Sequence, residues 1–323
     1  MIRDGILNIN KPQNMTSAQV VGAVRRILDV KKVGHTGTLD PMATGVLPIC
    51  IGKATRIMDY LNFDYKTYEC TLRLGLITDT LDIWGNVLEE RPVNVTSEDV
   101  ICAFDKYRGH ITQLPPMYSA VRIQGKHLYE YARKGEKPPE EIKQRKVFIK
   151  ELTVDSMDLS RGEVTFTVVC SKGTYIRTIC QDVGEDLQCG AVMVSLSRTA
   201  TGAFKVENSI SLVDLEKNGW DYLLPTDFPL VNFGKVIVNK YDAQRFIDGI
   251  HISKETCLYI EEPKPIDEGL RDFVDVSLLE AYNVYTENGE KLIYLGVAYY
   301  NKKYKKLSAD KVFYRRDENE SIL

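Results

Sequence analysis

The sequence is poor in histidine and tryptophan, and no apolar run in it is long. Its 323 residues include four His and two Trp, and the His residues at positions 35, 110, 127 and 251 do not have the spacing of metal ligands. We therefore expect no metal site. No stretch of about 18 apolar residues is present, which predicts that the chain does not span a membrane.

Cysteine usage and the N-terminal segment both favour a cytoplasmic protein. The seven cysteines are odd in number and form no C-x-x-C pair, so neither a disulfide framework nor a zinc site is expected, and a reducing compartment fits. The opening segment, MIRDGILNINKP, carries charge at positions 3 and 4 and only a short apolar run, unlike a signal peptide.

Nucleotide fingerprints are also absent. The glycine-rich segment at residues 34–45 fits neither G-x-x-x-x-G-K-[ST] nor G-x-G-x-x-G, and no cofactor is expected. The net charge of -3 does not suggest a nucleic-acid partner. However, residues 1–60 hold eight Lys/Arg against four Asp/Glu, and residues 121–150 hold nine against four. Such patches are compatible with a polyanion bound at one face, and equally with ordinary solvated charge.

The segment GHTGTLDPMATG at residues 34–45 is the densest group of chemically informative residues. Its three glycines permit backbone conformations that a side chain forbids, and Pro41 restricts Asp40 to an extended or turn geometry. The segment therefore predicts a shaped loop that presents one carboxylate. An Asp-Pro pair is also common in simple turns, and no second carboxylate nearby suggests an acid/base pair.

Periodicity places the other candidate residues on regular elements. We expect strands at 5–10, 65–74, 147–157 and 163–170, and helices at 16–28, 54–61, 96–107 and 176–187. The last 90 or so residues predict short strands at 234–238, 257–261, 273–278, 292–300 and 306–314. Arg177 lies in the first turn of the last predicted helix, where the macrodipole disfavours a cation. It therefore needs an anion, which is either a structural partner or Asp40.

Four motifs together resemble those of the TruB-type tRNA pseudouridine synthases. They span about residues 3–207 in the family's order: KP at 11–12, GHTGTLDP continuing through ATGVLP at 34–48, LGxxTDTxDxxG at 74–85 and SKGTYIR at 171–177. The resemblance implies an α+β fold, with a mostly antiparallel central sheet flanked by helices. It also implies a small C-terminal β-barrel-like PUA domain.

The resemblance assigns roles to individual residues. It implies that Asp40 is the nucleophile and Arg177 its partner, and that Tyr68 stacks on the target base and takes part in proton transfer. A strand Tyr is otherwise most often a cross-strand packing residue. The remaining expected site residues line the pocket or lie beside it: His35, which fills the space left by the flipped base, Tyr175, Leu196 and Lys11.

The same resemblance implies the substrate and the organisation of the chain. The substrate is tRNA, modified in the TΨC arm at position 55, with no cofactor. We expect a catalytic domain at residues 1–230, with a thumb-like insertion at about 96–146, and a PUA-like RNA-binding domain at 231–323. A plain β accessory domain is the alternative for the C-terminal part. A monomer is expected.

Two other functions remain open at this stage. One is the catalytic subunit of an RNA-guided pseudouridylation particle, and the other is a non-catalytic tRNA-binding or folding protein. The presence of Asp40 and Arg177 favours catalysis over the second.

Overall fold

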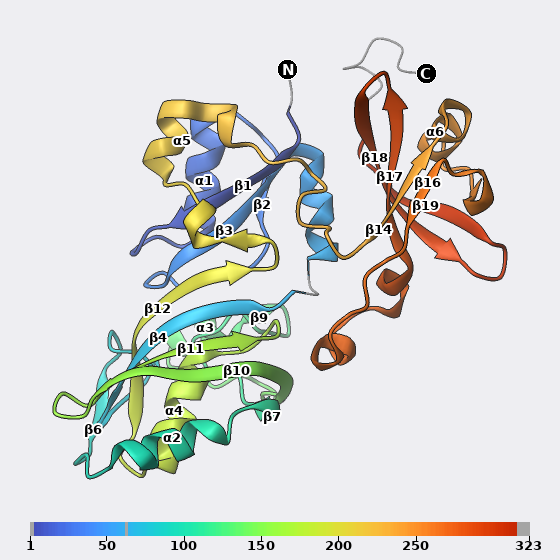
Figure 1. Ribbon diagram of the computed structural model, residues 1–323. Helices are drawn as coiled ribbons and strands as arrows, with labels where there is room; N and C mark the ends of the chain where they lie inside the picture. Colours follow the sequence, from blue (N-terminus) through green and yellow to red (C-terminus); the bar gives the residue numbers. More distant parts are fainter. Residues whose placement is uncertain (1–2, 62–63, 315–323) are drawn as a thin grey trace.

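The computed structural model describes residues 3–61 and 64–314. Two β-sheets lie side by side in it, one built by the first two thirds of the chain and one by the last third (Figure 1). The larger sheet has the order β1-β3-β12-β4-β11-β10-β7, with β2 paired to β3 and β13 paired to β12. Its pairs are antiparallel except β3 with β12, which is parallel.

The strands of the larger sheet include every strand predicted before residue 171. Their bounds are β1 Gly5–Lys11, β2 Val33–His35, β3 Thr44–Ile51, β4 Lys66–Leu74, β7 Gly109–Gln113, β10 Arg145–Asp158, β11 Glu163–Cys170, β12 Ala191–Thr201 and β13 Phe204–Lys205. Two small hairpins lie outside it, β5 Leu76–Thr78 with β6 Val87–Glu90, and β8 Arg122–Ile123 with β9 Lys126–His127.

Helices pack on the larger sheet through their apolar faces. They are α1 Ser17–Ile27, α2 Ser97–Asp105, α4 Ile176–Asp186 and α5 Leu212–Asn218, whereas α3 Leu128–Arg133 lies beside the small β8–β9 hairpin. Capping boxes begin α1 at Thr16 and α2 at Thr96, which confirms both predicted helix starts. The segment predicted as a helix at 54–61 is a 3-10 helix, η1 Gly52–Tyr60.

The two faces of strand β4 differ sharply. Tyr68, Cys70, Leu72 and Leu74 are buried, whereas the side chains between them are exposed or half-buried. Helices α2 and α4 cover the buried face, since Phe104 of α2 packs on Phe166 of the neighbouring β11 and the Cys70 and Cys180 sulfurs are 3.7 Å apart. The N-terminus of α4 therefore lies near the end of β4 that carries Tyr68.

The smaller sheet has the order β15-β19-β18-β17-β14-β16. One helix, α6 Lys240–Ile247, packs against it, and the strands are β14 Gly234–Val238, β15 Ile252–Ser253, β16 Tyr259–Glu261, β17 Ala281–Asn288, β18 Lys291–Asn301 and β19 Lys306–Val312. A mostly antiparallel sheet with helices, followed by a second all-β sheet that curls on itself, confirms the predicted α+β class (Figure 1).

One predicted strand in this part is wrong. Residues 273–278 were expected to be extended, but they fall on the 3-10 turns η5 Glu268–Phe273 and η6 Val276–Glu280, and the strand itself, β17, begins at Ala281. The cause is local, because the Asp275 carboxylate accepts hydrogen bonds from the Ser277 N–H at 2.9 Å and the Ser277 hydroxyl at 2.8 Å. These bonds favour a turn over the β preference of the neighbouring valines.

The two sheets share an apolar cluster. Ile6, Val46 and Ile57 from the first part pack with residues of the second, among them Val297 and Phe313. Polar contacts surround the cluster: Lys53 Nζ donates to Tyr314 O at 2.8 Å and Lys311 Nζ donates to Arg56 O at 2.8 Å. The smaller sheet is therefore docked on β1, β3 and η1.

Residues 96–146, predicted as a thumb-like insertion, divide into two parts in the structure. Helix α2 packs on the larger sheet, and β7 is the edge strand of that sheet. Residues 114–144 carry the β8–β9 hairpin and α3 outside that sheet.

Across the ranges 3–61 and 64–314, none of the helices has the length and apolar character needed to cross a membrane.

A pair of glycine substitutions tests the packing of the loop that enters β3. Gly45 has φ of +100°, and a Cβ there would lie 2.2 Å from the Arg198 carbonyl oxygen on β12. We expect Gly45→Ala to lower the free energy of unfolding by at least about 2 kcal/mol, from backbone strain and the clash together.

Gly22→Ala is the matched control, measured in the same urea titration. Gly22 lies in α1 with open space around its Cα, so Ala should raise the free energy of unfolding by about 0.5–1 kcal/mol through helix propensity. Equal effects of the two substitutions would contradict the close approach of β3 and β12.

Candidate active site

The Asp40 loop joins β2 to β3 and is fixed by side chains from the beginning of the chain. Ser17, the first residue of α1, accepts a hydrogen bond from Leu39 N at 2.9 Å and donates one to Leu39 O at 3.2 Å. Lys11 Nζ donates to Pro41 O at 3.0 Å, and also to Pro12 O and Met15 O. Backbone groups on both sides of Asp40 are thus held in place.

Lys11 is buried at the end of β1. Burial lowers its pKa to about 8, while the negative charge of Asp40 acts in the opposite direction and Arg198 adds to the lowering. The ammonium group is thus close enough to Asp40 and Arg198 to interact with both charges. Its three N–H donors are used by three carbonyl groups. Lys11 therefore holds the backbone around it in place, besides adding a positive charge near Asp40.

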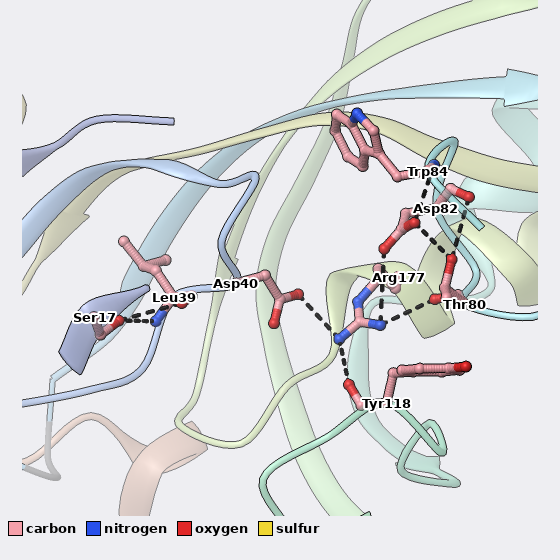
Figure 2. A network of polar contacts seen from close by, with 8 residues as sticks. All are labelled: Ser17, Leu39, Asp40, Thr80, Asp82, Trp84, Tyr118 and Arg177. Atoms are coloured by element: carbon pink, nitrogen blue, oxygen red, sulfur yellow. Dashed lines mark hydrogen bonds and ion pairs between the residues drawn. The ribbon is translucent and has the colours of Figure 1, made fainter. Parts of the chain in front are cut away.

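Arg177 brings three separate segments together. Its side chain is 6% exposed, and Nη2 lies 3.0 Å from Oδ2 of Asp40, whose side chain is 39% exposed. Nη1 donates to Thr80 O at 2.9 Å and Nη2 donates to Tyr118 O at 2.8 Å (Figure 2). The helix dipole disfavours a cation at the start of α4, and the negative charge of Asp40 offsets this effect.

A second carboxylate, that of Asp82, also lies near Arg177. Asp82 Oδ2 is 4.0 Å from Arg177 Nη1 on the side away from Asp40 (Figure 2). Its Oδ1 accepts from the Thr80 hydroxyl at 2.6 Å and from Trp84 N at 3.2 Å. Asp82 is therefore hydrogen-bonded within its own loop and positions Arg177, whereas Asp40 keeps one oxygen open toward solvent.

Tyr68, Leu196 and Arg198 share the covered face of the sheet. Strand register places Arg198 opposite Tyr68 and Leu196 opposite Cys70. Burial raises the pKa of the Tyr68 hydroxyl, and the positive charge of Arg198 opposes that shift. Arg198 is 1% exposed and donates through Nε to Val46 O at 2.7 Å and through Nη2 to Gly37 O at 3.3 Å. It links the Asp40 loop to the sheet next to Tyr68.

His35 ends β2 at the entrance to the same loop. Burial lowers its pKa, and Arg198 contributes to the lowering, so the imidazole is neutral near pH 7. Its Nδ1 is buried and has no hydrogen-bond partner among the described residues. This nitrogen therefore has the capacity for one further hydrogen bond.

Tyr175 is the N-cap residue of α4 and is held by Gln113 at the end of β7. Gln113 Oε1 accepts from Tyr175 N at 2.9 Å and its Nε2 donates to Tyr175 O at 3.1 Å. Because Gln113 is 2% exposed, both bonds are protected from water. The edge strand β7 thus fixes the first turn of α4, two residues before Arg177.

The structure brings Asp40, Arg177 and Lys11 into one site, with Tyr68, Leu196, His35 and Tyr175 on the elements that surround it. Sequence reasoning missed Asp82, Arg198 and Gln113. Arg198 carried a weak signal, since it is the charged residue of a strand that begins with an apolar run. The sequence around Gln113 carried no signal of its role.

No group of three His, Cys, Asp or Glu side chains in the described part of the chain is placed to hold a metal ion. The arrangement offers instead one partly exposed carboxylate, oriented by a buried guanidinium and placed beside a buried tyrosine. Such a site is suited to nucleophilic attack by the carboxylate on a ligand that enters over Tyr68.

Comparisons with known proteins identify the family of the chain. The N-terminal domain of the TruB family of pseudouridylate synthases matches residues 25–176, and the tRNA pseudouridylate synthase B C-terminal domain matches residues 177–226. The tRNA pseudouridine synthase B of Clostridium kluyveri is 43% identical over 91% of this chain and 95% of its own length. That of Clostridioides difficile is 45% identical over 78% of this chain and 85% of its own.

Solved structures share the fold at lower identity. A Cbf5-Nop10-Gar1 complex contains a chain that matches with a TM-score of 0.71 and 24% identity, over 97% of this chain and 86% of the other. An H/ACA RNP bound to a substrate RNA containing 2′-deoxyuridine gives a TM-score of 0.70 and 22% identity, with the same coverage. The second, smaller sheet is included in both matches, which is consistent with a PUA-like C-terminal domain.

Replacing Gln113 tests how far α4 depends on the edge strand. Gln113→Met keeps the length of the side chain but leaves the Tyr175 N–H without a partner, while the Tyr175 C=O keeps only its bond from Ile179 N at 3.2 Å. We expect the free energy of unfolding to fall by about 2 kcal/mol, the usual cost of unpaired buried polar groups. Gln181→Met, on α4 but without a side-chain hydrogen bond in the described structure, is the control and should change it by less than about 0.5 kcal/mol. Similar values for the two variants would rule out this anchoring.

Proposed function

Because the chain belongs to the TruB family of pseudouridylate synthases, we propose that it converts uridine 55 in the TΨC arm of tRNA to pseudouridine, with Asp40 as the covalent nucleophile. At the coarser level, the chain is a pseudouridine synthase, an isomerase that acts on tRNA. The observation that carries the finer proposal is the contact of 3.0 Å between Arg177 and the partly exposed Asp40.

The geometry supports Asp40 over Asp82 as the nucleophile. A nucleophile must reach its substrate, and the Asp40 side chain is 39% exposed against 16% for Asp82. The guanidinium of Arg177 contacts Oδ2 of Asp40 at 3.0 Å and so orients the carboxylate, which leaves Oδ1 free to attack. Attack on the uracil ring and attack on ribose C1′ both fit this arrangement.

The other site residues supply the pocket. The target base must leave its stack before a side chain can reach it, and His35 occupies the place that the base leaves. Tyr68 stacks on the flipped base, while Leu196 and Tyr175 line its walls. Asp40 forms a transient covalent bond to the substrate, the N1–C1′ bond breaks, a C5–C1′ bond forms, and the bond to Asp40 breaks again to release the carboxylate. The proton at C5 is lost to water and N1 gains a proton, so no redox partner or cofactor is required.

We extend the proposal to the organisation of the chain. Residues 1–230 form the catalytic domain, in which the insertion grips the RNA, and residues 231–323 form the PUA-like RNA-binding domain. The change of sheet between β13 and β14 supports this division. Lys11 is proposed to hold the Asp40 loop rather than to contact substrate, because its donors are used by three carbonyl groups. The protein is proposed to act as a cytoplasmic monomer.

Tritium release tests the reaction and the nucleophile together. An unmodified tRNA transcript labelled at uridine C5 should release tritium to water with the wild type, and Asp40→Asn should abolish release. Asp40→Asn should still bind the tRNA, because only the attacking atom is altered. Mapping the product should place pseudouridine at position 55. Absence of release with wild-type protein that still binds tRNA would favour a guide-dependent or non-catalytic function, and a co-purifying RNA would then be sought.

Arg177→Lys tests the ion pair. Lysine keeps the charge but cannot reach Asp40, Thr80 O and Tyr118 O at once, because it lacks the planar fork. We expect kcat to fall by at least about a hundredfold, in the range reported for lost electrostatic positioning, while the Kd for tRNA changes by less than about threefold. Equal losses in kcat and in affinity would contradict a specific role in orienting Asp40.

A further inference from the structure

A group of cations without acidic partners lies beside the Asp40 loop. Lys66 begins β4, Arg198 lies on β12 and Lys172 follows β11. Across the described ranges, no carboxylate oxygen comes within 4.0 Å of a charged nitrogen of these three residues. This differs from Arg177, whose charge is met by Asp40.

Two of the cations converge on one point of the loop. A Cβ built on Gly37 would lie 3.5 Å from Arg198 Nη1 and 3.5 Å from Lys66 Nζ. The absence of a side chain at Gly37 therefore lets the loop backbone come close to both nitrogens. Arg198 is 1% exposed and is hydrogen-bonded to the Val46 and Gly37 carbonyls and to Tyr68, so it contributes positive charge from the buried side. Lys66 and Lys172 are half-buried and are the cations that a ligand can reach.

The arrangement is electrostatically unfavourable without a ligand. Burial, and after it the positive charge of Arg198, lowers the pKa of Lys66 to about 8, and Lys172 adds to the effect. The nearby Cys170 thiol offers no compensating charge, since burial raises its pKa to about 12. A partly buried amine in a cluster of like charges is costly unless an anion binds there.

We propose that Lys66, Arg198 and Lys172 form a binding site for a phosphodiester group of the RNA strand next to the target nucleotide. The inference rests on the proposed function, since it takes RNA as the ligand and Tyr68 as the residue that stacks on the base.

Strand geometry places this site correctly for that role. Lys66 and Tyr68 are two residues apart on β4 and so point to the same face, about 6.6 Å apart along the strand. Arg198 is directly opposite Tyr68 on β12. A base stacked on Tyr68 therefore has its own backbone near Lys66 and Arg198. The cations would position the nucleotide and take no part in bond making.

The experiment is a double-mutant cycle between protein and RNA. Full-length tRNA is assembled by ligation with a single uncharged methylphosphonate at each backbone position around uridine 55 in turn. Binding is measured over a range of salt concentrations in an Asp40→Asn background, so that the RNA stays unmodified. Lys66→Met is compared with Lys66→Arg and with Lys217→Met, an exposed lysine on α5 that controls for net charge.

We expect Lys66→Met to weaken binding of unsubstituted tRNA about tenfold, the scale of a lost hydrogen bond to a charged group. The slope of log K against log salt should decrease in magnitude by about 0.7, the value for one contact with a single strand. A methylphosphonate at one backbone position should weaken binding by the protein that keeps Lys66 about tenfold, as Lys66→Met does. The same methylphosphonate should not weaken binding by Lys66→Met any further. Lys66→Arg should retain the salt slope and the coupling to that methylphosphonate. Lys217→Met should bind like the protein in which both lysines are unchanged.

Additive losses at every backbone position, or an affinity for Lys66→Met within twofold of the control, would overturn the proposal. If Lys66→Met fails to fold, Lys172→Met in the same cycle gives the decision, with coupling expected at the same phosphate. The readout is binding, so it is separate from the proposed reaction. Tritium release by the wild type without coupling would remove only the phosphate site, and coupling without tritium release would remove only the proposed reaction.

Discussion

The buried guanidinium of Arg177 is the constraint on which the site depends. A charge that is 6% exposed must be neutralised and its donors must be satisfied, and no single segment of the chain does both. The carbonyl groups of Thr80 and Tyr118 and the carboxylate of Asp40 come from three loops that are far apart in sequence. Because Arg177 itself is fixed by α4, and α4 by Gln113, the position of Asp40 is determined by the larger sheet and not by its own loop alone.

Charge around the Asp40 loop is distributed in two groups. Arg177 contacts the carboxylates of Asp40 and Asp82, and Lys11 adds a second positive charge near Asp40, so that group is balanced. Lys66, Arg198 and Lys172 have no acidic partner in the described structure, and that group carries a net positive charge. An overall charge of -3 therefore hides a local field of the opposite sign. The balanced group suits chemistry, whereas the unbalanced group suits the capture of an anion.

Local patterns predicted most elements of the fold, and the strand that was predicted wrongly failed for a local reason as well. Alternating burial along β4 and the capping boxes of α1 and α2 are encoded within a few residues, so they could be read directly. The strand predicted at 273–278 is wrong because two hydrogen bonds from Ser277 to Asp275 outweigh the β preference of the neighbouring residues.

The residues of the candidate site divide into those that stood out in the sequence and those whose role depends on distant contacts. Asp40 and Arg177 stood out by motif and by the unfavourable position of a cation at a helix start. Gln113, by contrast, contacts a residue 62 positions away, and no property of a lone glutamine indicates such a contact. Asp82 lies inside the motif at 74–85 and Arg198 lies two residues after Leu196, but their partners became identifiable only from the loop geometry and the strand register.

The order of strands in the larger sheet also bears on how the protein folds during its synthesis. Strand β4 lies at the centre and pairs with β11 and β12, which follow it by about a hundred residues, and β1 has bridges to Ile210 and Leu224. At roughly 5–20 residues per second, the ribosome needs many seconds to supply these partners. Until then β4 lacks both neighbouring strands and helix α4. A high contact order of this kind implies slow folding, with apolar surface exposed while the chain is being made.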